Sequence, residues 1–160
     1  PIFHNLNYRN LFLTLKDADS LTQLTSLSNL SGLTWLVVYR ADNLTDLTGL
    51  SNFPSLTTLL IRAHELTDIS ELTELTSLST LSLSGSEYAY SYRNNGKNLT
   101  DISPLAELQN LTTLSLKSFE LITDNQITLL KQALPNTEID FWLLRYPWYS
   151  LSIFIRRTRS

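Results

Sequence analysis

The chain has 160 residues, of which 42% are hydrophobic and 17% charged, so it can bury one sizeable core as a single globular domain. Its formal net charge of −3 provides no overall basic field, which makes nucleic acid an unlikely partner. Because the chain contains no Cys, it has no disulfide framework, no thiol chemistry and no cysteine-based zinc site. It also lacks Met and begins at Pro1, which indicates a processed or excised piece from which a signal peptide could already have been removed.

The first nine residues precede a repeating pattern that opens at Asn10. They contain four large apolar side chains, namely Ile2, Phe3, Leu6 and Tyr8. A repeat array must cover the exposed end of its core. We therefore expect residues 1–9 to form a short N-terminal cap.

Residues 10–141 consist of units that open at positions 10, 33, 56, 78 and 111, with leucines in register. In "LTTLSL", residues 111–116, the apolar residues alternate at the end, as in a short strand with one buried face. In "TDISELTELTS", residues 67–77, every third residue is apolar, which suits a 3₁₀-like turn. Each unit therefore predicts a strand, a turn, a short helical segment and a return. No unit can bury its leucines alone, so the units must stack and their strands must form a parallel sheet.

The stretch "LTDISPLAELQNLTTLSL", residues 99–116, resembles the leucine-rich repeats of internalins and related bacterial surface proteins. The resemblance implies an α/β solenoid with a short-strand parallel sheet on the concave face. It also implies 3₁₀ or helical segments on the convex side, terminal caps, and a protein-binding role without catalysis.

The chain departs from the family pattern in the turn after each strand. The position three residues after the last strand leucine is commonly Asn, whose side chain bonds neighbouring turn backbones. The equivalents here are Ala18, Ala41, His64 and Phe119. The turn backbone must therefore be satisfied without an asparagine ladder, and we expect Phe119 to pack inward.

The predicted concave face carries the residues that alternate with the core positions of each strand. In its first half these are mostly apolar and aromatic, whereas in its second half they are small and hydroxylated. The residues of the first half are Phe12, Trp35, Val37, Tyr39, Leu60 and Arg62. An exposed aromatic patch beside an Arg is typical of a protein-binding hot spot. Two alternatives are that another segment covers the patch, or that these are scattered exposed residues without a function.

Three carboxylates recur at the start of the helical segments, each after a Thr: Asp46, Asp68 and Asp101. A row of oxygen ligands could hold calcium. We favour the simpler interpretation that each Asp caps free backbone N–H groups, and we also interpret His64 as a turn residue and not a metal ligand. The chain has two His residues and neither a glycine-rich phosphate loop nor a nucleophile elbow. We therefore predict no enzyme activity, no metal and no cofactor.

The fourth unit is about eleven residues longer than the others because of an insertion at residues 84–98. It contains Tyr88, Tyr90 and Tyr92, followed by the turn signal Asn94-Asn95-Gly96. Tyrosines on a loop supply contact area at a low entropic cost, which favours recognition of the same protein partner. The alternative is a lid that folds back over the solenoid.

The repeat pattern ends in a predicted helix at about residues 124–134, capped by Thr123 or Asp124 and stopped by Pro135. Ile139 and Phe141 then supply the alternation of one further strand. Residues 142–160 are aromatic and basic, with no acid. We favour a C-terminal cap for this tail over contact with a membrane surface, and it is too interrupted to span a bilayer.

The leading functional hypothesis is a non-catalytic protein-binding module of a bacterial surface or secreted protein. One alternative is an intracellular scaffold or regulatory leucine-rich repeat protein in the cytoplasm. Another is a structural spacer within a larger envelope protein. The sequence does not identify the partner or the oligomeric state.

Overall fold

The computed structural model describes residues 11–85 and 99–142, and within them it contains one six-stranded parallel sheet in the order β1-β2-β3-β4-β5-β6. The strands are β1 (Leu11–Leu15), β2 (Leu33–Val38), β3 (Thr58–Arg62), β4 (Thr80–Ser84), β5 (Thr113–Lys117) and β6 (Glu138–Trp142). Short 3₁₀ helices follow the first four strands, and an α-helix follows the fifth. They are η1 (Thr25–Leu27), η2 (Leu50–Asn52), η3 (Ser70–Glu74), η4 (Ser103–Glu107) and α1 (Asp124–Ala133).

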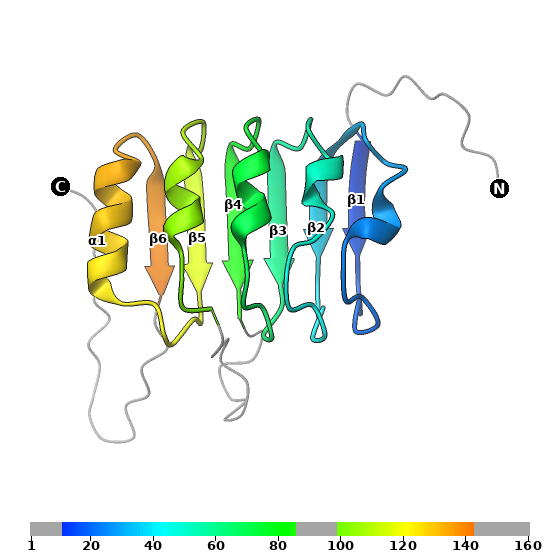
Figure 1. Ribbon diagram of the computed structural model, residues 1–160, viewed down its shortest axis with the longest axis horizontal. Coiled ribbons are helices and arrows are strands. Elements are labelled where there is room, and N and C mark those ends of the chain that lie inside the picture. Colours follow the sequence, from blue (N-terminus) through cyan, green and yellow to red (C-terminus); the bar gives the residue numbers. More distant parts are fainter. Residues whose placement is uncertain (1–10, 86–98, 143–160) are drawn as a thin grey trace.

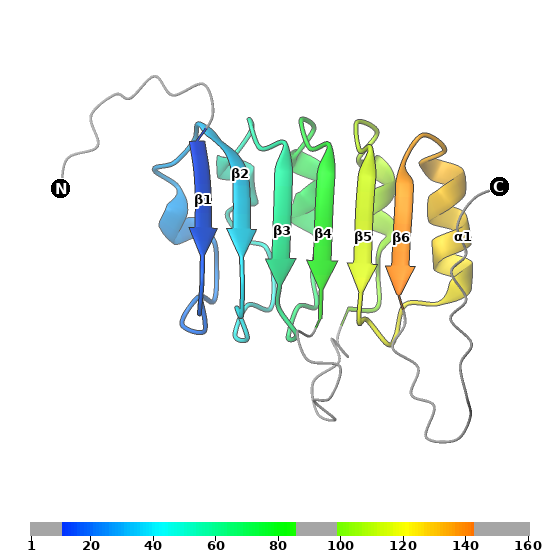
Figure 2. The same cartoon turned by 180° about the vertical axis from the view of Figure 1, so that it is seen from behind.

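The helical segments lie on one side of the sheet and all strands run in the same direction (Figures 1 and 2). This is the predicted leucine-rich repeat solenoid, with each coil adding one strand next to the strand of the coil before. The predicted N-terminal cap at residues 1–9 lies outside the described residues. So do most of the insertion at 84–98 and all of the tail at 142–160 except Trp142, whose backbone ends β6.

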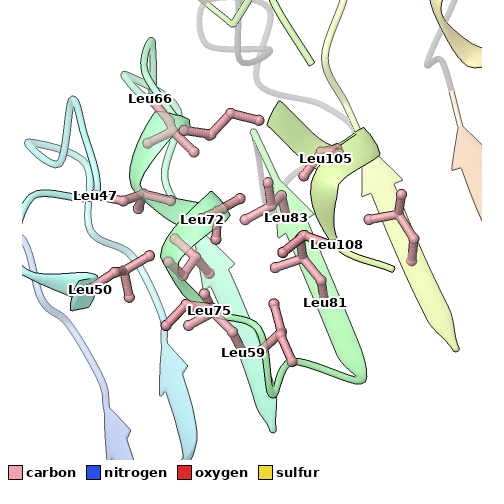
Figure 3. Packing of buried hydrophobic residues seen from close by; sticks show 14 of the residues in the cluster. Leu47, Leu50, Leu59, Leu66, Leu72, Leu75, Leu81, Leu83, Leu105 and Leu108 are labelled. Atoms are coloured by element: carbon pink, nitrogen blue, oxygen red, sulfur yellow. The ribbon is translucent and has the colours of Figure 1, made fainter. Parts of the chain in front are cut away.

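The core lies between the sheet and the helical segments and consists mostly of the repeating leucines, joined by Ile, Val, Ala and Phe side chains (Figure 3). Leu59, Leu81 and Leu114 lie in register on three neighbouring strands, and all three are fully buried. The leucines at every third position of the helical segments, such as Leu72 and Leu75, close the other side of the core. The alternation predicted for the strands is confirmed at these positions.

Backbone hydrogen bonds between consecutive coils satisfy the turns that follow the strands. The N–H of the first inward residue after each strand donates to a carbonyl of the next coil. These bonds are Ala18 to Tyr39, Ala41 to Arg62, Ala63 to Ser84 and Gly85 to Lys117, at 3.0–3.2 Å. A small inward side chain therefore suffices where the family commonly has Asn. Phe119 occupies this position in the fifth coil and is buried, as predicted.

The placing of His64 at the Asn-equivalent position is wrong by one residue, and in the fifth coil the inward residue is Ile122 and not its neighbour Leu121. Ala63 is buried in place of His64, and Ile122 is buried whereas Leu121 is 48% exposed. The cause is a left-handed residue that lengthens some turns and not others. Such residues occur in the first, second and fifth coils, at Asp17 (φ 52°), Arg40 (φ 55°) and Ser118 (φ 61°).

A second ladder at the start of the strands consists of Thr and Ser hydroxyls. Each hydroxyl donates to a backbone carbonyl of the preceding coil, so neighbouring coils are joined at this edge of the sheet as well. The bonds are Thr34 to Leu11, Thr57 to Thr34, Ser79 to Thr57, Thr112 to Ser79 and Thr137 to Leu111, at 2.6–3.2 Å. The two ladders join the coils at both ends of the strands, and the Asn43 and Asn110 side chains add further bonds to the carbonyls of Asp19 and Thr76 in the preceding coils.

The predicted terminal helix is confirmed as α1. Thr123 is its N-cap residue and forms a capping box with Gln126. The Thr123 Oγ1 accepts from the Gln126 N–H at 3.3 Å, and the Gln126 Oε1 accepts from the Thr123 N–H at 2.8 Å. Ile127 and Leu130 are buried on the inner side of α1, which replaces a 3₁₀ segment on the fifth coil.

Candidate functional site

The outer sheet face is the face of β1–β6 that points away from the leucine core. Its exposed large apolar side chains within the described residues are Phe12 on β1, 63% exposed, and Trp35 on β2, 40% exposed. The two residues are partners in the β1–β2 register, and their ring centroids are 5.8 Å apart at an interplanar angle of 57°. This tilted arrangement is favourable for aromatic pairs. The pair forms a ready-made apolar contact surface of two large rings.

Val37 is a correction to the predicted site, because its side chain is only 5% exposed. It lies in register between Thr14 on β1 and Leu60 on β3, and between Trp35 and Tyr39 along its own strand. These neighbours on three strands shield Val37 although it points away from the core. Val37 therefore supports the patch from below, and Leu60, which is half-buried, remains at the surface.

Tyr39 and Arg62 form a second pair at the end of the strands. The Arg62 Cζ lies 5.0 Å from the centroid of the Tyr39 ring, within the range of a cation–π interaction. Their backbones lie close to the same junction between two coils, where the Ala41 N–H donates to the Arg62 carbonyl. The structure thus brings together five of the predicted residues on β1–β3 as the aromatic patch: Phe12, Trp35, Tyr39, Leu60 and Arg62.

The outer sheet face of β4–β6 is different in character, as the sequence predicts. It presents short hydroxylated side chains, among them Thr80, Ser82 and Ser115. The Ser115 Oγ is buried and finds no hydrogen-bond partner within the described part of the chain. Charged side chains occur at the far edge of this face, where the Lys117 Nζ lies 3.5 Å from the Asp140 Oδ2. Among the described side chains, the large apolar ones of the outer sheet face therefore lie on β1–β3.

The tyrosines of the insertion, Tyr88, Tyr90 and Tyr92, lie outside the described residues. The described residues nevertheless fix where the insertion leaves the sheet. It leaves after Gly85, whose N–H donates to the Lys117 carbonyl at 3.0 Å, at the strand end where Tyr39 and Arg62 also lie. A shared surface between the insertion and the aromatic patch remains a prediction.

The recurring aspartates act as turn caps. The Oδ1 atoms of Asp46, Asp68 and Asp101 accept hydrogen bonds from the backbone N–H two residues later, at 2.8–2.9 Å. Hydrogen bonds from Thr48 lower the pKa of Asp46, and those from Ser103 lower the pKa of Asp101. Residues 11–85 and 99–142 contain no group of three or more His, Cys, Asp or Glu side chains that could hold a metal. The His64 Nε2 instead lies 3.3 Å from the Asp42 Oδ1.

We expect the Asp101 turn to lose part of its stability in acid. Its folded-state pKa lies below the ordinary value of 3.8, so the carboxylate stabilises the fold above that value and stops doing so as the pH falls through the folded pKa. At pH 7, Asp101→Ala should lower the free energy of unfolding by about 1 kcal/mol, because the Ser103 N–H loses its cap. Asp101→Asn keeps an acceptor oxygen without titrating. Its stability, measured by urea unfolding, should fall less between pH 6 and pH 3 than that of the wild type, and an equal fall would contradict this origin of the pKa shift.

None of the helices within the described residues is long and apolar enough to cross a membrane.

Comparison with known proteins supports the fold. No protein-family model matches the chain, and no curated protein does. Among solved structures, an internalin C2 of Listeria monocytogenes is 26% identical, with a TM-score of 0.56, over 74% of this chain and 46% of its own. A leucine-rich repeat protein of Leptospira interrogans is 20% identical (TM-score 0.49), over 73% of this chain and 33% of its own. A second Listeria internalin, InlF, is 23% identical (TM-score 0.47), over 77% and 39%.

The similarity to internalin C2 confirms the resemblance drawn from the repeats and the solenoid fold. This fold typically binds proteins and is usually non-catalytic. The chain spans less than half the length of that internalin.

Proposed function

We propose that this leucine-rich repeat solenoid is a non-catalytic module of a bacterial surface or secreted protein, and that it binds a protein partner through the aromatic patch. The observation that supports this most is the exposed Phe12–Trp35 ring pair. Where a strand residue only has to face water, a Thr or Ser is sufficient, as on β4 and β5. Two large rings at 63% and 40% exposure are therefore an unfavourable choice unless another molecule covers them.

The composition of the aromatic patch also fits a protein interface. Trp, Tyr and Arg are the residues most enriched at binding hot spots, and each is present here once: Trp35 on β2, Tyr39 directly after β2, and Arg62 at the end of β3. Val37, shielded beneath them, helps to hold the rings in place before the partner arrives. Pre-positioned side chains lose little entropy on binding.

We further propose that the tyrosine-bearing insertion contributes to the same interface. The strand end from which it leaves, after Gly85, is also the end that carries Tyr39 and Arg62. Replacing Tyr90 by Ala should then weaken the same interaction as replacing Trp35.

Trp35→Ala should weaken partner binding by at least about 1–2 kcal/mol while leaving the melting temperature nearly unchanged, because the ring is exposed. The immobilised chain first captures partners from host and bacterial extracts. The affinity of each captured protein for wild-type and variant chains is then measured by surface plasmon resonance. Tyr39→Ala should behave in the same way.

Lys131→Ala is the matched control, since Lys131 is exposed on α1, on the opposite side of the sheet from the aromatic patch. Equal loss of binding in Trp35→Ala and Lys131→Ala would show that the patch is not the binding site. If the Trp35→Ala variant keeps its binding affinity and a normal melting temperature, the proposal is contradicted.

A further inference from the structure

We propose that two copies of this chain associate through the end of the solenoid formed by the first coil, residues 11–32, with their β1 strands paired antiparallel about a two-fold axis. The first coil lies at one end of the row of strands (Figure 1). This association goes beyond the proposed partner binding and does not depend on it. It uses the edge of β1 and the inner leucines, whereas the proposed partner site lies on the outer sheet face.

The apolar core is incompletely covered at the first coil. Leu13 and Leu15 on β1 are half-buried, whereas their register partners on β2, Leu36 and Val38, are fully buried. The other inward leucines of the first coil, except Leu24, differ in the same way from the fully buried residues one unit later. The half-buried leucines are Leu11, Leu13, Leu15, Leu21, Leu27 and Leu30. A solenoid end with this much accessible apolar surface requires a polar cap or a second surface that covers it.

The first coil also lacks the acidic residues that the next three coils carry on their helical sides. Residues 20–32 contain no Asp, Glu, Lys or Arg. The equivalent stretches contain one acid in the second coil (43–55), four in the third (65–77) and two in the fourth (98–110). The charged residues of the first coil, Lys16, Asp17 and Asp19, all lie in the turn after β1. Depletion of charge around apolar side chains is typical of the core of a protein interface.

β1 offers main-chain hydrogen-bonding groups along its outer edge. The Tyr39 N–H donates to the Leu15 carbonyl at 2.9 Å, so Leu15 and, by alternation, Leu13 direct their backbone groups towards β2. The N–H and C=O groups of Phe12 and Thr14 consequently point away from β2. Within the described residues β1 is the terminal strand of the sheet, and no described strand pairs with these groups. The edge of such a strand is a template for the addition of another extended chain.

A second first coil fits these three features better than a single extended segment of another protein. One extended segment would pair with β1 but would leave Leu21, Leu27 and Leu30 uncovered, because they belong to the rest of the coil. A second copy brings an equivalent strand edge and the same leucines without charged residues among them. A two-fold axis normal to the sheet keeps the helical segments of both copies on one side, so the leucines of the two ends meet in one core.

A two-fold axis through Leu13 pairs all five residues of β1. Phe12 of one copy then lies opposite Thr14 of the other, and the two residues exchange both hydrogen bonds, as the direction of their backbone groups requires. Leu13 faces the same residue of the other copy on the core side, and Leu15 faces Leu11. The charged turns that follow the two β1 strands lie at opposite ends of the strand pair, so their like charges do not meet.

Sedimentation equilibrium of the full chain should show dimers that dissociate on dilution. Thr14→Pro should raise the dissociation constant at least about tenfold, because it removes one N–H from each copy and therefore two hydrogen bonds from the dimer. The Thr14 N–H is not used between β1 and β2, and Pro is tolerated at such an edge position. Thr14→Ala keeps the N–H and is the matched control, so it should dimerise like the wild type. Circular dichroism checks that both variants are folded.

The chain contains no Cys, so single cysteines can test the register. Under mild oxidation Leu13→Cys should form a covalent dimer, because the two facing Cα atoms would be about 4.5 Å apart, within the range of a disulfide. Leu15→Cys is the matched control, since its two Cα atoms would be more than about 13 Å apart. Both substitutions replace a half-buried leucine on the same side of β1.

A wild-type chain that remains monomeric at its highest soluble concentration would overturn the dimer and would favour the cap predicted for residues 1–9. Equal dissociation constants of folded Thr14→Pro and Thr14→Ala would overturn the pairing of the β1 edges. Assemblies that grow beyond two chains with concentration would point to head-to-tail stacking and contradict the two-fold axis. Cross-linking of Leu15→Cys in place of Leu13→Cys would overturn the register. None of these outcomes affects the proposed partner binding, which the Trp35→Ala variant tests separately.

Discussion

Leu81→Ala should lower the free energy of unfolding by about 2–5 kcal/mol. Leu81 is fully buried at the centre of β4, with Leu59 and Leu114 as its register partners on the two neighbouring strands. Its side chain points into the leucine core, where the helical segments close the other side (Figure 3). The loss combines the removed apolar surface with the cavity that two flanking coils cannot close. Urea unfolding followed by circular dichroism measures it.

Ser82→Ala is the control for this substitution, because Ser82 is the next residue on β4 and lies on the outer sheet face. Its effect should stay within about 0.5 kcal/mol. A melting temperature of Leu81→Ala within a degree or two of the wild type would show that the register of the coils is wrong.

Gly49→Ala should cost about 3 kcal/mol or more, because it combines backbone strain with a clash. Gly49 has a φ of +105°, a conformation that side chains with a Cβ rarely adopt. A Cβ at this position would lie 2.5 Å from the backbone N of Thr25 and 2.8 Å from the carbonyl carbon of Leu24 in the preceding coil. Backbone atoms cannot move aside as a flexible side chain does. Thermal unfolding should therefore show a large decrease in melting temperature.

Gly32→Ala provides the matched comparison. No atom lies within 4 Å of a Cβ built on Gly32, which is exposed in the loop before β2. The same substitution should there be neutral, or stabilise the fold by up to about 1 kcal/mol through a less flexible unfolded chain. If Gly49→Ala and Gly32→Ala melt alike, the close approach of the coils at Gly49 is not a constraint on the fold.

The sequence predicts the core well because burial follows two simple spacings. Leucines at every third position of a helical segment and at alternate strand positions all point into the core of a stacked coil. Leu72 and Leu81, which are fully buried, are examples. The helix α1 was equally predictable, since Thr123 and Gln126 form a local capping signal and Pro135 follows. Local chemistry and periodicity are both visible in a single chain.

The errors arise where neighbouring coils decide the outcome. The turns with Asp17, Arg40 and Ser118 in the left-handed region contain neither Gly nor Asn there, so no residue type marks which turns are one residue longer, and the inward position in the third coil falls on Ala63 and not on His64. Val37 alternates like an exposed strand residue, and only its partners on β1 and β3 reveal that it is shielded. The hydroxyl ladder was missed for the same reason, because each Thr or Ser bonds a carbonyl about one unit away in the sequence.

The ladders that join each coil to the next have a consequence for how such a chain can change its length. Every bond in them links adjacent coils, and none spans two. A tandem duplication of residues 56–77 would give the new coil a Thr hydroxyl, an inward Ala and a strand leucine at the required positions. The duplication would lengthen the solenoid by one coil and leave the contacts between the remaining coils unchanged. The aromatic patch on β1–β3 and the insertion after β4 would then move one strand spacing apart, about 4.8 Å. The distance between two surface features in this architecture is thus set in discrete steps by the number of units between them.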